Sequence, residues 1–132
     1  MEKTIFNEIK YKEDAKRYKE LFYSCSTAAN QVLSFLMMMT FHEIGEDIQK
    51  KGMLVEEYIK RIPSEFPNHK TIMSKQNIRN MCKFSLLIEV EEITTLRLFE
   101  YKWSELIPYI ESSNNHDEFI AHIEAERKAG KA

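Results

Sequence analysis

No proline interrupts the chain between Tyr11 and Gln49, and most residues of this stretch are good helix formers. Apolar residues recur there at steps of three and four, namely Phe22, Ala29, Val32, Leu33, Leu36 and Met37. Because this spacing places side chains on one face of an α-helix, we expect one long helix that ends near Gly52. A chain of 132 residues has room for one modest core, so we expect a single helical domain over residues 1–132.

The same stretch contains 22 consecutive uncharged residues, Leu21 to His42, which is about the length that crosses a bilayer. Seven of them are serine, threonine, asparagine or glutamine, whose polar groups are costly in hydrocarbon but find partners inside a protein. We therefore expect a central helix that is packed on most of its sides, and no membrane span. The mixed charges that follow Met1 do not resemble a secretory signal, so we expect a cytoplasmic protein.

The rest of the chain also favours helices, because three glycines and three prolines are too few for an all-β fold. The expected fold class is all-α, a compact multi-helix domain with one long central helix and a helix-turn-helix-like segment. Further helices are expected at 54–62, at 75–87 with Ser74 as N-cap, at 89–99, at 104–111 with Ser104 as N-cap, and at 116–128. A turn at 64–66 is expected between Pro63 and Pro67.

Basic residues are concentrated in one segment of a chain whose net charge is only −2. Residues 66–88 hold four basic and no acidic side chains, whereas residues 89–132 hold five basic and ten acidic ones. The predicted nucleic-acid-binding residues are Lys70, Lys75, Gln76, Arg79, Asn80 and Lys83. Five of these, 75 to 83, share one predicted helix face, where cations can neutralise phosphates and amides can pair with base edges. An ordinary solvated face and a surface that docks on an acidic protein are the alternatives.

Catalytic and metal-binding patterns are sparse. The chain has no glycine-rich phosphate loop and no evident catalytic triad, and we expect a non-catalytic protein without cofactors. Cys25 and Cys82 are expected to be buried, reduced thiols. His116, Glu118, His122 and Glu126 can face one way on the last helix, but a solvated surface is the preferred interpretation over a metal site. Met37–Met39 is interpreted as core filler and Trp103 as a packing anchor rather than a base-stacking platform.

Several short motifs occur in a recognisable order: Asn30 in the long helix, Phe41 with Ile44-Gly45 and Ile48, Ser74-x-x-Asn77-Ile78-x-x-Met81, and Trp103-Ser104-x-Leu106. This order resembles the N-terminal helical domain of YhcG-type proteins over roughly residues 15–125. The resemblance implies a helical domain that recognises nucleic acid or another protein, and that full-length relatives join to a PD-(D/E)xK nuclease domain. We expect the recognition domain here without that nuclease domain.

Two functions follow. The first is a DNA- or RNA-binding domain that tethers or regulates a nuclease. The alternative is a phage or mobile-element protein that binds and inhibits a host defence nuclease or its guide complex, as anti-CRISPR proteins do, with Glu89, Glu91 and Glu92 as the contact face. A homodimer is also expected, because one small domain cannot cover all apolar residues such as Phe22, Tyr23 and Met37–Met39.

Overall fold

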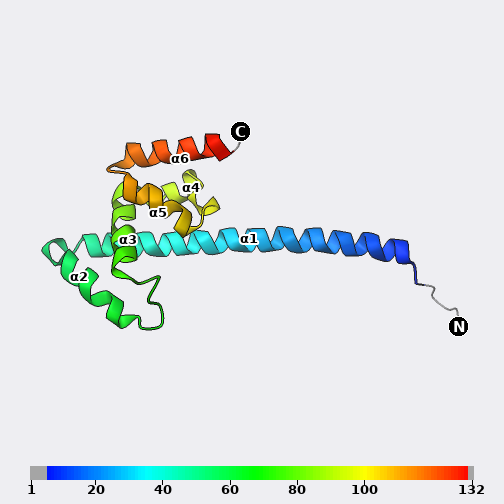
Figure 1. The fold of residues 1–132 in the computed structure, drawn as a ribbon, viewed down its shortest axis with the longest axis horizontal. Helices are drawn as coiled ribbons and strands as arrows, with labels where there is room; N and C mark the ends of the chain where they lie inside the picture. The colour runs from blue at the N-terminus through cyan, green and yellow to red at the C-terminus, as the bar shows by residue number, and fades with distance from the viewer. Residues whose placement is uncertain (1–5, 131–132) are drawn as a thin grey trace. The chain divides into compact units, whose positions relative to one another are not determined.

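The computed structural model describes residues 6–130, apart from the side chains of Phe22 and Cys25, and all regular structure in this range is helical (Figure 1). The all-α prediction is therefore confirmed, while the expectation for the Cys25 thiol lies outside the described residues. The elements are α1 (Glu8–Gln49), η1 (Gly52–Leu54), α2 (Val55–Arg61), η2 (Ile62–Glu65), α3 (Lys75–Leu87), α4 (Glu92–Thr95), η3 (Leu98–Glu100), α5 (Trp103–Ser112) and α6 (His116–Gly130). None of the described helices combines the length and apolar content that a bilayer crossing needs.

The long helix α1 runs through two compact units of the chain, residues 1–33 and residues 34–132. The described part of the first unit contains α1 alone, and Tyr18, Leu21 and Val32 are more than half exposed. The expectation that the helix is packed on most of its sides is wrong for this unit, because a lone helix has no neighbour within it. The single domain over residues 1–132 stays a prediction.

The core of the second unit consists of two apolar clusters that meet at Trp103. One cluster includes Met38 and Phe84, and the other includes Phe41 and Met81. The Trp103 ring lies 4.8 Å from the Phe41 ring and 5.2 Å from the Phe84 ring, measured between centroids. Its Nε1 donates a hydrogen bond of 2.7 Å to Asn77 Oδ1 at the start of α3. The prediction that Trp103 anchors the packing is confirmed.

Helix α3 crosses α1 at Gly45 (Figure 1). A Cβ atom at position 45 would overlap the main-chain carbonyl of Met81 and would come within 2.9 Å of the Cys82 nitrogen. Both are backbone groups that cannot rotate away, so only glycine permits this approach. Cys82 beside the crossing is buried and unpaired, as predicted for a reduced thiol.

The predicted helix over residues 89–99 is wrong, since the structure has two short pieces, α4 and η3, separated by Arg97 in the left-handed conformation (φ 54°). Ile93 and Leu98 are both fully buried. Both side chains belong to one core cluster, whereas in a continuous α-helix they would point about 140° apart. The chain breaks instead, and Arg127 of α6 donates hydrogen bonds to the freed carbonyls of Leu96 (2.6 Å) and Arg97 (3.1 Å).

Two smaller expectations also differ from the structure. Helix α5 begins at Trp103, so Ser104 lies inside the first turn and is not the N-cap. The Glu105 carboxylate caps the helix by accepting a 2.8 Å hydrogen bond from the Lys102 N–H. The expected turn at 64–66 is in part helical, because η2 continues from α2 through Pro63, a residue that the first helical turn accommodates.

An ion pair joins the start of α6 to α4. His116 Nε2 lies 2.7 Å from Glu92 Oε2, and Glu92 Oε1 accepts a 2.9 Å hydrogen bond from the Glu89 N–H. The hydrogen bond to Glu92 raises the pKa of His116 above its ordinary value. Burial alone would raise the pKa of Glu92, but the hydrogen bonds from His116 and Glu89 outweigh it and lower that pKa.

Replacing Gly45 by alanine is expected to destabilise the protein by about 3 kcal/mol, because the added methyl group forces two helix backbones apart. Urea unfolding measures the change. Gly130→Ala is the matched control, because its Cβ would meet only the Glu126 carboxylate at an ordinary 3.9 Å. Equal stability of the Gly45→Ala variant and the unchanged protein would contradict the proposed close approach.

The His116–Glu92 pair is expected to stabilise the protein most between pH 4.5 and pH 6.5, the ordinary pKa values of the two groups. The raised pKa of His116 means that its contribution is lost as the pH rises through that pKa, and the lowered pKa of Glu92 means that its contribution is lost in acid. His116→Gln should therefore lower the thermal midpoint more at about pH 5.5 than at about pH 8.5. His69→Gln, a change at an exposed histidine, should show no such difference.

Candidate nucleic-acid interface

Helix α3 forms as the sequence predicts, from Lys75 to Leu87. Ser74 begins it by accepting a 3.1 Å hydrogen bond from the Asn77 N–H through its hydroxyl. The expected inward face is confirmed, since Ile78, Met81, Cys82 and Phe84 are buried. The cations at positions 75, 79 and 83 recur every four residues along the other side.

Two of the predicted residues are fully available. Lys70, in the irregular segment before α3, and Lys75, its first residue, are exposed. Neither makes a hydrogen bond or ion pair with the described residues. The connection between α2 and α3, residues 62–74, contains Lys70 and is longer than the tight turn of a helix-turn-helix, although α2 and α3 do contact each other.

Arg79 is already paired. Its Nη1 donates to both carboxylate oxygens of Glu56 on α2, at 2.8 Å and 2.9 Å. The hydrogen bond and the charge of Glu56 raise the pKa of Arg79. Both side chains are largely exposed, at 46% for Arg79 and 71% for Glu56, so water screens the pair.

The remaining three predicted residues face the neighbouring helix α5. Lys83 Nζ donates a 2.9 Å hydrogen bond to the main-chain oxygen of Glu111, and Gln76 Nε2 donates to the Glu111 carboxylate at 3.3 Å. Asn80 is 4% exposed and accepts a 3.4 Å hydrogen bond from Gln76. The prediction that all five residues 75–83 share one face open to water is therefore wrong for Asn80. Helix α5 packs against this side of α3 and covers it.

The alternative contact residues are only partly free. Glu89 and Glu91 are exposed, whereas Glu92 is half-buried and bonded to His116. A surface of three available carboxylates is therefore not present. The Glu92 carboxylate instead binds the Glu89 N–H and His116, and so stabilises the start of α4 and its contact with α6.

The four residues considered for a metal site hold separate structural bonds. Besides His116, Glu118 Oε2 accepts a 2.6 Å hydrogen bond from the Asn114 N–H, and Glu126 Oε2 accepts one of 2.7 Å from the Tyr101 hydroxyl. His122 Nδ1 lies 3.0 Å from the Ser113 hydroxyl. Among the described side chains of residues 6–130, which leave out Cys25, no group of three His, Cys, Asp or Glu could hold a metal ion.

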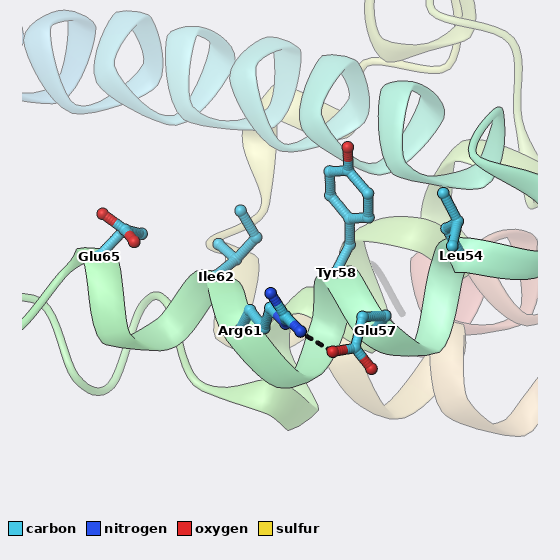
Figure 2. Close-up of a pocket in the computed structure, with 6 residues that line it drawn as sticks. All are labelled: Leu54, Glu57, Tyr58, Arg61, Ile62 and Glu65. Carbon is cyan, nitrogen blue, oxygen red and sulfur yellow. Dashed lines mark hydrogen bonds and ion pairs between the residues drawn. The ribbon is translucent and has the colours of Figure 1, made fainter.

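A shallow groove of about 390 Å³ runs along α2 and η2 (Figure 2). Leu54, Tyr58 and Ile62 form its apolar part, and an ion pair between Glu57 and Arg61 lies at its edge. The lining contains no nucleophile beside a base, so the groove does not resemble an active site.

Two acidic residues that the sequence pattern missed decide how much of the basic face is free. Glu56 lies 23 positions before Arg79, and Glu111 lies 28 positions after Lys83. No local pattern links residues so far apart, because the packing of α2 and α5 on α3 creates both contacts. Only the full arrangement of helices reveals them.

Comparisons of the chain with protein-family models, with characterised proteins and with solved structures find no match. The arrangement of α3 and its neighbours therefore carries the functional argument alone.

Proposed function

We propose that this protein is a non-catalytic binding domain that holds nucleic acid through phosphate contacts from Lys70, Lys75 and Arg79. The observation that carries the proposal is the pair of exposed, unpartnered lysines at the start of α3, in a segment that contains no carboxylate. Lysine and arginine bind phosphates and release the counterions around them, which gives affinity without any particular fold.

Arg79 is included among the phosphate-binding residues because a phosphate can replace Glu56 as the partner of its guanidinium group. An exposed ion pair contributes little to stability, while a phosphate offers arginine the same two-pronged geometry with more negative charge. Glu56 then competes with the nucleic acid for Arg79. Its carboxylate also repels phosphates nearby.

The contacts proposed here position the nucleic acid and do not read its sequence. The two amides that could pair with base edges, Gln76 and Asn80, are engaged within the protein, and Asn80 is buried. Lys83 is half-buried against Glu111 and is left out of the proposed set. Binding should therefore be strongly salt-dependent and weakly selective.

The YhcG-type resemblance and a role beside a nuclease remain proposals. They are supported by the structural positions of the residues that carry the resemblance. Gly45 allows the crossing of α1 and α3, Ser74 caps α3, and Trp103 joins the two core clusters. Residues that fix a fold in this way are those that related domains would share. A recognition domain of this kind would bring a nuclease to its substrate by tethering.

Replacing both Lys70 and Lys75 by alanine is expected to reduce the slope of log affinity against log salt by about 2, because each lysine releases roughly one counterion. Titration of labelled duplex and single strands at several salt concentrations measures the slope. The matched control replaces Lys102 and Lys128, two exposed lysines outside the segment. If the unchanged protein binds neither strand type in dilute salt but retains a nuclease from a host lysate, the inhibitor alternative replaces this proposal.

Glu56→Gln is expected to strengthen nucleic-acid binding by about 3- to 10-fold, because it frees Arg79 and removes a repelling charge. The same titration measures the gain, and adding Arg79→Ala should abolish most of it. Glu57→Gln makes the same change of charge one residue along α2, where the carboxylate pairs with Arg61, and should have a smaller effect. An unchanged affinity for Glu56→Gln would show that Arg79 does not contact phosphate.

A further inference from the structure

We propose that two copies of this chain dimerise as a parallel, in-register coiled coil formed by residues 11–32 of α1. The described part of the unit 1–33 is the first part of α1 preceded by Phe6 and Asn7, and it contains no second helix against which α1 could pack. Isolated helices are marginally stable in water and gain most of their stability from packing of an apolar face. The helix is therefore built to meet another surface.

The apolar residues of this helix form an unbroken stripe with alternating steps of four and three. Its members are Tyr11, Ala15, Tyr18, Phe22, Cys25, Ala29 and Val32. The average step of 3.5 residues is the heptad repeat of a coiled coil, and the stripe covers three heptads. Tyr11, Tyr18 and Val32 remain 54%, 58% and 58% exposed, although the Tyr11 ring contacts Phe6 and Arg17 lies over the Tyr18 ring.

A second copy fits the charges beside the stripe. With Ala15, Phe22 and Ala29 at the a positions of the heptads, Asp14 takes a g position and Lys19 the following e position. In a parallel pair, a g side chain faces the e side chain of the next heptad on the partner. The Asp14 carboxylate lies 3.5 Å from Lys10 Nζ and 3.3 Å from Arg17 Nη2 on its own helix. In the dimer, Asp14 of each copy would in addition face the partner's lysine at position 19, which makes two further pairs of opposite charge.

The division of charge along the helix favours the parallel orientation. Charged residues end at Glu20, and the flanking positions beyond it are apolar at Leu21, Ala28 and Leu33. Parallel alignment places Ala28 beside Leu33 of the other copy. It also places the charged flanking positions of one copy beside the charged flanking positions of the other. An antiparallel pair would place Lys12 beside the apolar Leu33 of the other copy and would separate Lys19 from Asp14.

The oligomeric state of the full chain tests whether the stripe forms the dimer interface, the seam of the coiled coil. Sedimentation and light scattering are expected to show a dimer, and Val32→Lys should raise its dissociation constant by about a hundredfold or more, because it buries a charge in the seam. Asn30→Lys is the matched control, since position 30 lies on the opposite side of the helix and should leave the dimer intact. Circular dichroism verifies that both variants remain helical.

Thiol cross-linking tests the orientation. In a Cys25→Ala background, Val32→Cys should form an intermolecular disulfide on mild oxidation, because equivalent d positions lie opposite each other only in a parallel, in-register pair. Asn30→Cys should cross-link far less. Cys82 is buried and does not interfere.

A chain that is monomeric at high concentration would overturn the proposal, as would a dimer that Val32→Lys and Asn30→Lys weaken equally. A dimer that depends on Val32 without cross-linking at position 32 would refute the parallel orientation. Nucleic-acid binding by a monomer would leave the function proposed above intact, so the two proposals fail independently.

Discussion

The close approach of α1 and α3 at Gly45 is the contact on which the second unit depends. Because no side chain separates the helices there, the backbone of Met81 and Cys82 lies against α1. The residues on either side of this point then face opposite clusters, with Ile78 and Met81 in one and Phe84 and Leu87 in the other. Trp103 fills the junction, and the remaining side of α3 is left for its polar residues. The close spacing of the α1 and α3 backbones therefore determines which side chains of α3 are buried and which face the solvent.

Around α3, the charged groups that lie close together in the structure are far apart in the sequence. Residues 66–88 contain no carboxylate, yet α2 brings the Glu56 carboxylate to Arg79, and α5 brings the main-chain oxygen of Glu111 to Lys83 and its carboxylate to Gln76. The two acids act differently. Glu56 meets an exposed arginine in a pair that water screens, whereas Glu111 lies among partly covered groups on the side of α5. The basic surface thus has an open end at Lys70 and Lys75 and a closed end at Lys83.

Sequence reasoning was most successful where local signals agreed with each other. Helix α3 could be predicted to the residue because Ser74 is a good N-cap and the apolar spacing is regular. The segment 89–99 could not, because its apolar spacing suggested one helix and gave no sign of the left-handed residue Arg97 that separates α4 from η3. The contacts of Gln76 and Lys83 with Glu111 depend on the position of α5, which no pattern within α3 encodes. Apolar periodicity also predicted the helix α1 correctly. It could not show whether the exposed apolar side chains of α1 pack against a second copy of this chain or against another protein.

Helix α6 contacts residues 92–97, the interrupted helical segment before α5, at two places. The contacts come from His116 near the start of α6 and from Arg127 near its end. Between Glu92 and Arg97, the regular structure is the short helix α4 (Glu92–Thr95) alone. Detachment of α6 would free the carbonyls of residues 96 and 97 and the carboxylate of Glu92 together. Amide protons of α4, η3 and α6 should consequently exchange with solvent as one cooperative unit, so this region opens in a single step.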